Sequence, residues 1–255
     1  MATFEAQVEG LTSLSIDGSS APTQTELTQF LTDGAKEVIN SLPPGLLPLC
    51  AAQATFTSTA AGSESETLNT GNILNVLRND GDIDQPCRQI SADDKGRVSD
   101  PKDMSYAKIS DPVYYVENNK INVLPDGGSC KYSEVQYPAV AYGDSAIAVF
   151  PDEAEYLVPL YASVKALQNK MGSMSAEIPV NSDQDGSFSS SSSSSQGYEK
   201  VRNLLESQED IELSSGTIAA LSSEMQQFVA EYQWYQSQQA KLEADYEKGL
   251  QRLRG

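Results

Sequence analysis

The C-terminal end of the chain carries a nearly uninterrupted heptad repeat, which constrains the fold more than any other feature. Its seam positions alternate by three and four residues: Ile218, Leu221, Met225, Phe228, Tyr232, Tyr235, Gln239, Leu242, Tyr246, Gly249 and Leu253. This spacing forms one narrow stripe on a helix and favours packing against another helix at a shallow angle. A helix from Thr217 to Arg254 would be about 55 Å long. Because several seam residues are aromatic or polar, we expect a mixed contact with a neighbouring protein rather than a self-sufficient dimer zipper.

Two further helices are predicted from their caps and apolar stripes. Thr23-Gln24-Thr25-Glu26 fits a capping box, in which the Thr and Glu side chains satisfy exposed backbone N–H groups at the start of residues 23–49. The apolar face that follows is Leu27, Phe30, Leu31, Val38, Ile39 and Leu42, and the run ends at Pro43-Pro44. Residues 150–174 form the central helix, with acids in its first turn and lysines near its end. Its expected buried stripe is Leu157, Tyr161, Val164, Leu167 and Met171, with a bend at Pro159.

The segments that flank these helices are predicted from composition. Residues 1–22 are polar and rich in serine, which indicates an extended N-terminal arm. Residues 175–197 contain a nearly pure serine tract, which cannot bury apolar area and is typical of a flexible linker. Tyr198–Leu213 is a shorter helix, and Ser214-Ser215-Gly216 turns the chain into the heptad helix. Residues 198–255 are therefore predicted to form a helical hairpin.

Residues 50–142 have the pattern of short strands separated by turns. The predicted strands are Ala54–Thr59, Ile73–Leu77, Cys87–Ile90, Val113–Glu117, Lys120–Leu124 and Ser129–Tyr137. Turns are expected at Asn79–Asp82, Asp93–Gly96 and Pro125–Gly128, and Asn118-Asn119 supplies a two-residue hairpin turn because asparagine tolerates positive φ. The predicted fold is therefore α+β: a helical bundle with a long C-terminal helical hairpin and an inserted antiparallel β-meander domain.

The composition argues against several functional classes. The 255 residues include 17 basic and 36 acidic ones, and the net charge of -19 opposes long-range attraction to nucleic acid or to an anionic membrane. The same charge is compatible with a role beside DNA, because a negatively charged wall lets a polyanion pass without binding. The chain has no histidine, which excludes serine–histidine triads and most catalytic zinc sites. No phosphate loop or nucleophile elbow is present either, so we expect no enzymatic activity and no cofactor.

Cysteine and apolar patterns add expectations about the compartment. Cys50, Cys87 and Cys130 are odd in number and widely spaced, so we expect reduced thiols rather than a disulfide framework or a zinc site. No apolar run is long enough to cross a bilayer, and Met1–Gly10 has no signal-peptide pattern. We therefore expect a protein made in the cytoplasm that has no contact with a membrane.

Two acidic stretches, Asp80–Asp84 and Asn181–Gly186, partly match a calcium-binding loop. A complete loop has a glutamate at its twelfth position, where these stretches have Ser91 and Ser192. We therefore expect solvated turns and no metal site.

Aromatic residues supply the remaining candidates for binding. Tyr114, Tyr115, Tyr132, Tyr137 and Tyr142 could stack sugars or bases, but tyrosine also favours half-buried strands, which is the preferred interpretation. Trp234 lies off the heptad seam, and it either contacts a neighbouring subunit or packs against the Tyr198–Leu213 helix. The candidate partner-interface residues are Tyr232, Trp234, Tyr235, Leu242, Tyr246, Leu250 and Leu253.

Most of the chain resembles a family of virion proteins. The segments that carry the resemblance are Ala2–Leu11, Leu27–Asn40, Asp111–Pro125, Asp152–Leu157, Tyr232–Tyr235 and Asp245-Tyr246. Together and in this order they resemble structural neck proteins of marine and cyanobacterial tailed phages. These motifs are compositional patterns and include no catalytic signature.

The resemblance implies a head-to-tail adaptor that works by assembly. Such a protein forms a homo-oligomeric ring, expected to be a dodecamer, beneath the portal protein and provides a platform for the tail. The other partners would be neck and tail proteins, with transient, non-specific contact with the passing phage DNA, and the location would be the head-tail junction of the virion. The alternatives are another tail, baseplate or head component, and a carbohydrate-binding module that uses the tyrosines.

Overall fold

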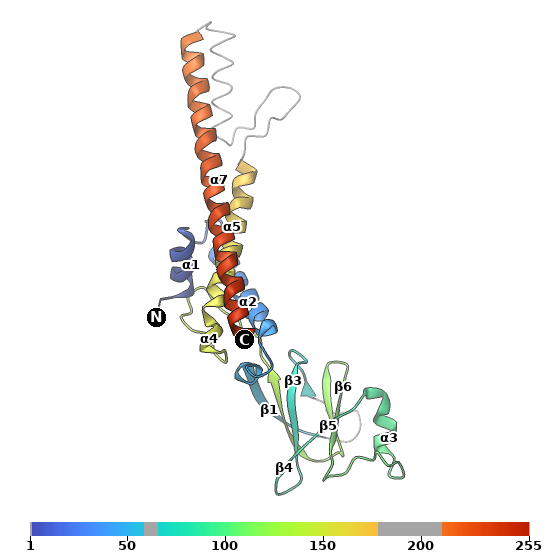
Figure 1. Ribbon diagram of the computed structural model, residues 1–255. Helices are drawn as coiled ribbons and strands as arrows, with labels where there is room; N and C mark the ends of the chain where they lie inside the picture. Colours follow the sequence, from blue (N-terminus) through green and yellow to red (C-terminus); the bar gives the residue numbers. More distant parts are fainter. Residues whose placement is uncertain (1, 59–65, 178–210, 255) are drawn as a thin grey trace, which may run out of the picture. The chain divides into compact units, whose positions relative to one another are not determined.

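The computed structural model describes residues 2–58, 66–177 and 211–254, without the side chains of 175–177, 211–221 and 224. The chain divides into two compact units, which are drawn in Figure 1. Unit 1 comprises Met1–Gly34, Ala141–Ser145 and Leu157–Arg252, and unit 2 comprises Ala35–Val140, Ala146–Tyr156 and Leu253–Gly255. Unit 1 is helical and unit 2 contains two four-stranded sheets, so the predicted α+β class is confirmed.

The N-terminal segment is helical, and the prediction of an extended arm over residues 1–22 was wrong. Helix α1 spans Phe4–Thr12 and is capped by Thr3, whose side chain accepts a hydrogen bond from the Ala6 N–H. Phe4 and Val8 lie one turn apart and are fully buried, and α1 packs against α5 (Leu157–Glu177). The serine-rich composition of the following residues obscured this short apolar pair.

Helix α2 spans Gln24–Ser41 and begins as the sequence predicts. The Thr23 N–H donates to Glu26 Oε2 at 2.7 Å, and the Glu26 N–H donates to Thr23 Oγ1 at 3.3 Å, which confirms the capping box. Of the predicted apolar face, Phe30 is only partly buried, whereas the other members are buried. After the Pro43-Pro44 pair, the short 3-10 helix η1 spans Leu47–Cys50.

The central helix is interrupted at Tyr156, so that α4 covers Asp152–Glu155 and α5 covers Leu157–Glu177. Pro159 has no N–H to donate to the Glu155 carbonyl, which explains a break where the sequence predicts a bend. α5 extends three residues beyond the predicted end at 174, and it is buried on most of its circumference. The linker predicted at 175–197 otherwise lies outside the described residues.

The terminal helix α7 spans Ile211–Arg254 and has 44 residues, which corresponds to a length of about 66 Å. It runs through Ser214-Ser215-Gly216, so the turn predicted there was wrong. A glycine inside a helix costs about 1 kcal/mol, which a long, cooperative helix tolerates. The partner helix of the hairpin was predicted at Tyr198–Leu213. Its residues 198–210 lie outside the described residues, and its last three residues belong to α7. None of the helices described is both long and apolar enough to cross a bilayer.

Helices α2, α5 and α7 meet in unit 1 around Tyr161. A Cβ on Gly34 of α2 would lie 2.9 Å from Tyr161 Cδ1, so α2 approaches α5 closely at this glycine. The rings of Tyr161 and Tyr246 lie 5.8 Å apart and join α5 to α7, which run side by side in Figure 1. Lys165 Nζ lies 5.5 Å from the Tyr161 ring centroid.

Unit 2 contains two sheets, each of four strands, rather than the single meander that the sequence predicts. Sheet A has the order β1 (Ala51–Thr57), β8 (Ser129–Val135), β3 (Ile73–Asn79), β4 (Asp84–Pro86). Sheet B has the order β2 (Glu66–Thr67), β7 (Lys120–Leu124), β6 (Val113–Glu117), β5 (Arg88–Gln89). β8 pairs with both β1 and β3, and β5 is parallel to β6. Strand order differs from sequence order because long-range pairing, which local turn signals do not encode, decides it.

The best-predicted part of unit 2 is the β6–β7 hairpin. Asn118 and Asn119 have φ values of 53° and 59°, as a two-residue turn that matches the strand twist requires. The turn predicted at Asp93–Gly96 was wrong: η2 (Ala92–Asp94) and α3 (Lys95–Ser99) form there. Ser91 caps this helical segment by accepting a hydrogen bond from the Asp93 N–H, a local signal that the polar composition obscured.

Among the described residues of unit 2, two charged side chains are almost fully buried, and each binds the backbone of a loop. Arg78 on β3 is 4% exposed, and its Nε donates to the Pro125 carbonyl at 3.0 Å. Glu134 on β8 is 1% exposed and accepts hydrogen bonds from the N–H groups of Asn69, Thr70 and Gly71. Burial raises the pKa of Glu134, but these N–H groups outweigh it, so the pKa lies below its usual value.

All three cysteines lie in unit 2 and are free thiols, as predicted. Cys50 and Cys130 are buried, and Cys87 is half-buried against the same core cluster as Cys130. Burial raises the pKa of Cys50 to about 11, and burial together with the neighbouring Cys130 raises that of Cys87 to about 12.

Candidate functional site

The terminal helix divides into a covered and an exposed stretch. On the C-terminal side of Phe228 the heptad seam packs against other parts of this chain: Tyr235 is 8% exposed, Leu242 is 5% exposed and Gly249 is buried. On the N-terminal side of Phe228, the seam residue Met225 is 45% exposed. The C-terminal half of the predicted stripe therefore belongs to the core of this chain.

This division changes which predicted interface residues a partner could reach. Tyr235 and Leu242 are buried within the chain, so as a contact surface for another protein these two predictions were wrong. Tyr232, Tyr246, Leu250 and Leu253 are half-buried. Trp234 is 41% exposed and is the most accessible of the seven. The alternative interpretation, that Trp234 packs against the predicted helix Tyr198–Leu213, concerns a segment of which residues 198–210 lie outside the described residues.

Trp234 is held in place by its neighbours on α7. Its ring meets that of Tyr235 edge to face at a centroid distance of 5.1 Å. The Tyr235 hydroxyl donates to Glu231 Oε1 at 3.2 Å, and burial followed by the nearby Glu231 carboxylate raises the pKa of Tyr235. A large aromatic surface is thus presented to solvent on an ordered base, which suits protein recognition.

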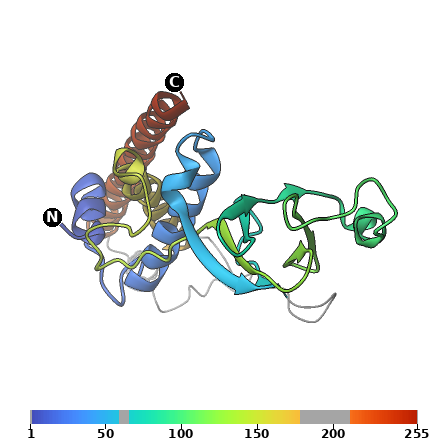
Figure 2. The ribbon, with the colours of Figure 1, turned by 90° about the horizontal axis from the view of Figure 1, so that it is seen from below.

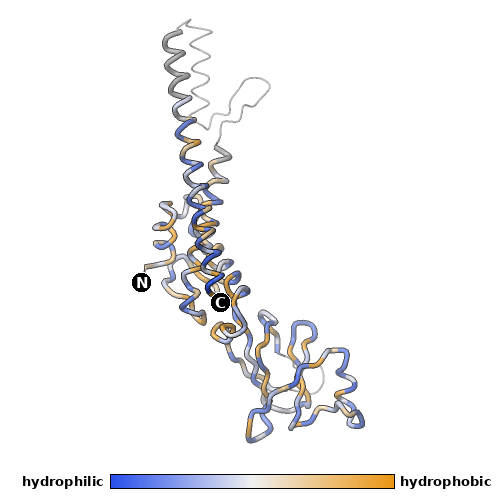
Figure 3. Tube along the Cα trace, in the orientation of Figure 1, coloured by the Kyte–Doolittle hydropathy of each residue, from blue (hydrophilic) through white to orange (hydrophobic). Residues whose placement is uncertain are grey.

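An open apolar groove lies along the same helix, toward its N-terminal end. It measures about 420 Å³, and the described residues that line it are Ser222, Met225, Gln226, Val229, Ala230 and Gln233. These positions recur at three- and four-residue steps and form one stripe, with Val229 47% exposed. In Figure 3 this part of α7 alternates between apolar and polar residues. We call Trp234 and the groove residues together the α7 surface.

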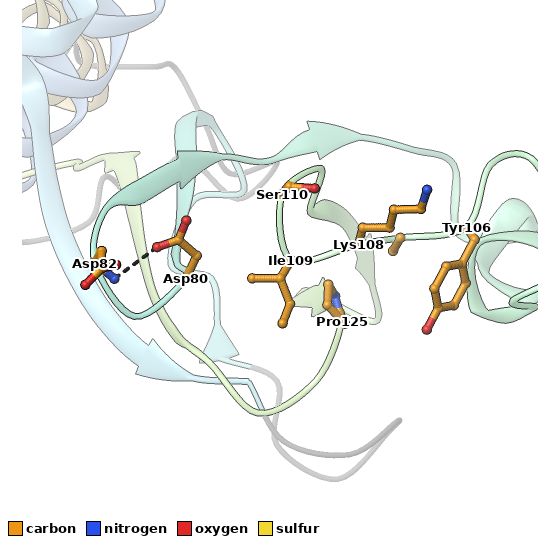
Figure 4. Close-up of a pocket in the computed structure, with 8 residues that line it drawn as sticks. Asp80, Asp82, Tyr106, Lys108, Ile109, Ser110 and Pro125 are labelled. Atoms are coloured by element: carbon orange, nitrogen blue, oxygen red, sulfur yellow. Dashed lines mark hydrogen bonds between the residues drawn. The ribbon is translucent and has the colours of Figure 1, made fainter.

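Unit 2 has a separate, shallow pocket, drawn in Figure 4. It lies between the β3–β4 turn, the 106–110 loop and Pro125, and it is lined by Asp80, Asp82, Tyr106, Ala107, Lys108, Ile109, Ser110 and Pro125. Asp80 Oδ1 accepts the N–H groups of Asp82 and Ile83, which lowers the pKa of Asp80. The ionised Asp80 carboxylate therefore stabilises its own turn.

The acidic stretches and the tyrosines that the sequence offered as candidates for metal binding or stacking have structural contacts, as far as the structure describes them. Asp84 of the first acidic stretch pairs with Lys131 at 2.7 Å, and the described parts of the chain contain no cluster of potential ligands that could hold a metal. The second stretch, Asn181–Gly186, lies outside the described residues. Tyr114, Tyr115 and Tyr132 are buried, and the Tyr137 hydroxyl donates to Asn40 Oδ1. The interpretation as strand residues is therefore confirmed for Tyr114, Tyr115 and Tyr132. Tyr137 and Tyr142 lie beyond the end of β8, and of the five tyrosines only Tyr142 is exposed.

Sequence reasoning missed the groove, because its polar members Ser222, Gln226 and Gln233 lie off the heptad seam. Val229 follows Met225 by one turn, and this spacing was the available signal.

No model of a known protein family matches the sequence, and neither does any curated protein.

Proposed function

We propose that this chain is a structural virion protein of a tailed phage, the head-to-tail adaptor of the neck. In this role it forms a ring beneath the portal protein and a platform for tail attachment, and DNA passes through its channel. The resemblance of its segments to phage neck proteins suggests the class, and the α7 surface is the observation that supports an assembly role. A long helix that presents an anchored tryptophan beside an apolar groove is suited to docking on another protein.

Charge supports the same role. A net charge of -19 keeps the chain from binding the DNA backbone tightly, which is what a channel wall for passing DNA requires. The finer architecture belongs to this proposal: a helical bundle whose C-terminal hairpin docks on the portal or on neighbouring protomers, with the sheets toward the next ring or the tail.

The test is to mix the purified chain with portal rings from candidate marine and cyanobacterial tailed phages and to image the product by electron microscopy. We expect rings decorated beneath the portal, with α7 against the portal or a neighbouring protomer. Trp234→Ala should weaken this binding at least tenfold, because an exposed tryptophan at an interface contributes about 2 kcal/mol or more. Gln236→Ala, an exposed change two residues away, is the matched control. A bound ring in which α7 extends into solvent without a contact would contradict the proposal.

The second candidate is another tail, baseplate or head component, supported by the same α7 surface. Binding to isolated tail or head structures, and not to portal rings, would favour it. A carbohydrate-binding module has less support, since most of the candidate tyrosines are buried. Binding on a glycan array would revive it.

A further inference from the structure

The four edges of the two sheets differ in how they are protected from pairing with another strand. β4 has three residues and contains Pro86 and the ion-paired Asp84, and β2 and β5 have two residues each. Short, charged or proline-containing edges are the usual devices that prevent such pairing. β1 has none of them: its sequence, AAQATFT, is seven residues long, with no charge, proline or glycine. β1 is the light-blue strand at one edge of sheet A in Figure 2.

The hydrogen bonds of β1 show which backbone groups face outward. The Gln136 N–H donates to the Cys50 carbonyl, and the Ser58 N–H donates to the Gly128 carbonyl. In an antiparallel pair, alternate residues bond to the same neighbour, so the even-numbered residues of β1 bond to β8. The N–H and carbonyl groups of Gln53, Thr55 and Thr57 therefore point away from β8. In the described parts of the chain, no residue bonds to these groups.

The side chains of β1 favour an additional strand as well. Ala54 and Phe56 pack against the sheet core but are only partly buried, and the Phe56 ring lies 5.8 Å from that of Tyr132. A strand beside β1 would cover the exposed part of this apolar row. Gln53, Thr55 and Thr57 lie on the opposite, exposed face and form a short polar row.

We propose that the occupant of this edge is β1 of a second copy, which joins the two sheets A across a twofold axis. With Thr55 opposite Thr55 of the other copy, Gln53 lies opposite Thr57 on both sides of the axis, and three residue pairs make about six hydrogen bonds. Two copies of a chain with a net charge of -19 repel each other over most of their surfaces. The two β1 strands can still approach each other, because β1 carries no charge. Threonine–threonine and polar cross-strand pairs are favourable.

The proposal is independent of the adaptor function, and its test is the mass of the free, full-length chain in solution. Sedimentation equilibrium at concentrations up to about 0.2 mM should show a dimer that strengthens at higher salt, because salt screens the repulsion between acidic copies. Thr55→Lys and Thr55→Glu each place like charges opposite one another and should raise the dissociation constant at least tenfold. An equimolar mixture of the two variants should restore dimerisation, because lysine then faces glutamate.

Asn75→Lys adds the same charge to an exposed position on the interior strand β3 and should leave the dimer intact. Circular dichroism verifies that each variant is folded. A wild-type chain that stays monomeric throughout the range overturns the proposal and leaves the edge to a strand of another protein. A dimer that persists in both Thr55 variants overturns it too, because the copies then meet elsewhere. Loss or retention of portal binding is a separate readout that bears only on the adaptor function.

Discussion

The two units differ in how their buried polar groups are satisfied. In unit 1, Thr12 and Ser163 each donate to a carbonyl four residues earlier in their own helix. In unit 2, Arg78 and Glu134 bind backbone groups of loops that are distant in sequence. A helix satisfies its own backbone, whereas loops that connect strands need partners from elsewhere, and a buried charge can serve several at once. Unit 2 should therefore depend on single polar residues, and unit 1 on packing.

The largest effect is expected from Glu134→Ala, which leaves the N–H groups of Asn69, Thr70 and Gly71 without their acceptor. We expect unit 2 to lose about 4 kcal/mol of stability, as when one partner of a buried charged network is removed. Hydrogen exchange of the unit 2 amides would measure the loss. Glu134→Gln keeps the shape and one acceptor oxygen and should cost less. Equal losses in both variants would mean that the carboxylate charge is unimportant.

The next effect concerns packing in unit 1. Leu242→Ala removes a buried side chain from the covered stretch of α7 and should cost about 3 kcal/mol. Val229→Ala, on the exposed stretch of the same helix, should change stability by less than about 0.5 kcal/mol. Urea unfolding of both variants would measure the difference. Similar costs would show that α7 is uniformly covered, contrary to the exposures described above.

A smaller effect is expected where α2 approaches α5. Gly34→Ala places a methyl group 2.9 Å from Tyr161 Cδ1, and overpacking should exceed the gain in helix propensity, with a net cost of about 1 kcal/mol. Gly10→Ala in α1 is the matched control, because its methyl group meets open space. That variant should be more stable than the wild type by up to about 1 kcal/mol. Thermal unfolding should show a lower melting temperature for Gly34→Ala and a higher one for Gly10→Ala.

The smallest and most specific effect is a pH dependence in unit 2. The pKa of Glu134 is lower in the folded state than its usual value of 4.5, so its contribution is fully present above that value and is lost as pH falls through the folded pKa. The difference in unfolding free energy between the wild type and Glu134→Gln should therefore shrink on acidification from neutral pH. Other carboxylates, such as Asp84, contribute equally to the pH dependence of both proteins, so their contributions cancel in this difference. A difference that does not change with pH would contradict this account.

Local chemistry was predictable from the sequence, and long-range pairing was not. The Thr23–Glu26 capping box and the Asn118-Asn119 turn involve neighbours in sequence, and both are confirmed. The position of β8 between β1 and β3 depends on contacts between distant segments, so the meander prediction failed. The helix at Phe4–Thr12 was missed because a two-residue apolar stripe is weak next to a polar composition.

The same limit applies to the candidate site. The heptad seam predicted which residues of α7 lie on one face, but it could not tell whether this chain or another protein covers that face. Tyr235 and Leu242 are covered within this chain, and the off-seam Trp234 is exposed. The position of β1 at an edge of sheet A was not visible in the sequence either, because an edge is defined only once the strand order is known.

The location of all three thiols in unit 2 makes them reporters of that unit alone. Their raised pKa values leave almost no thiolate at neutral pH while the unit is closed, and alkylating reagents attack the thiolate. The rate of alkylation in native buffer therefore depends on how often unit 2 opens. It does not report on unit 1, which contains no cysteine. A cysteine introduced at Gln233 or Trp234 would react quickly, so a fluorescent dye could be attached to the α7 surface without modifying the interior.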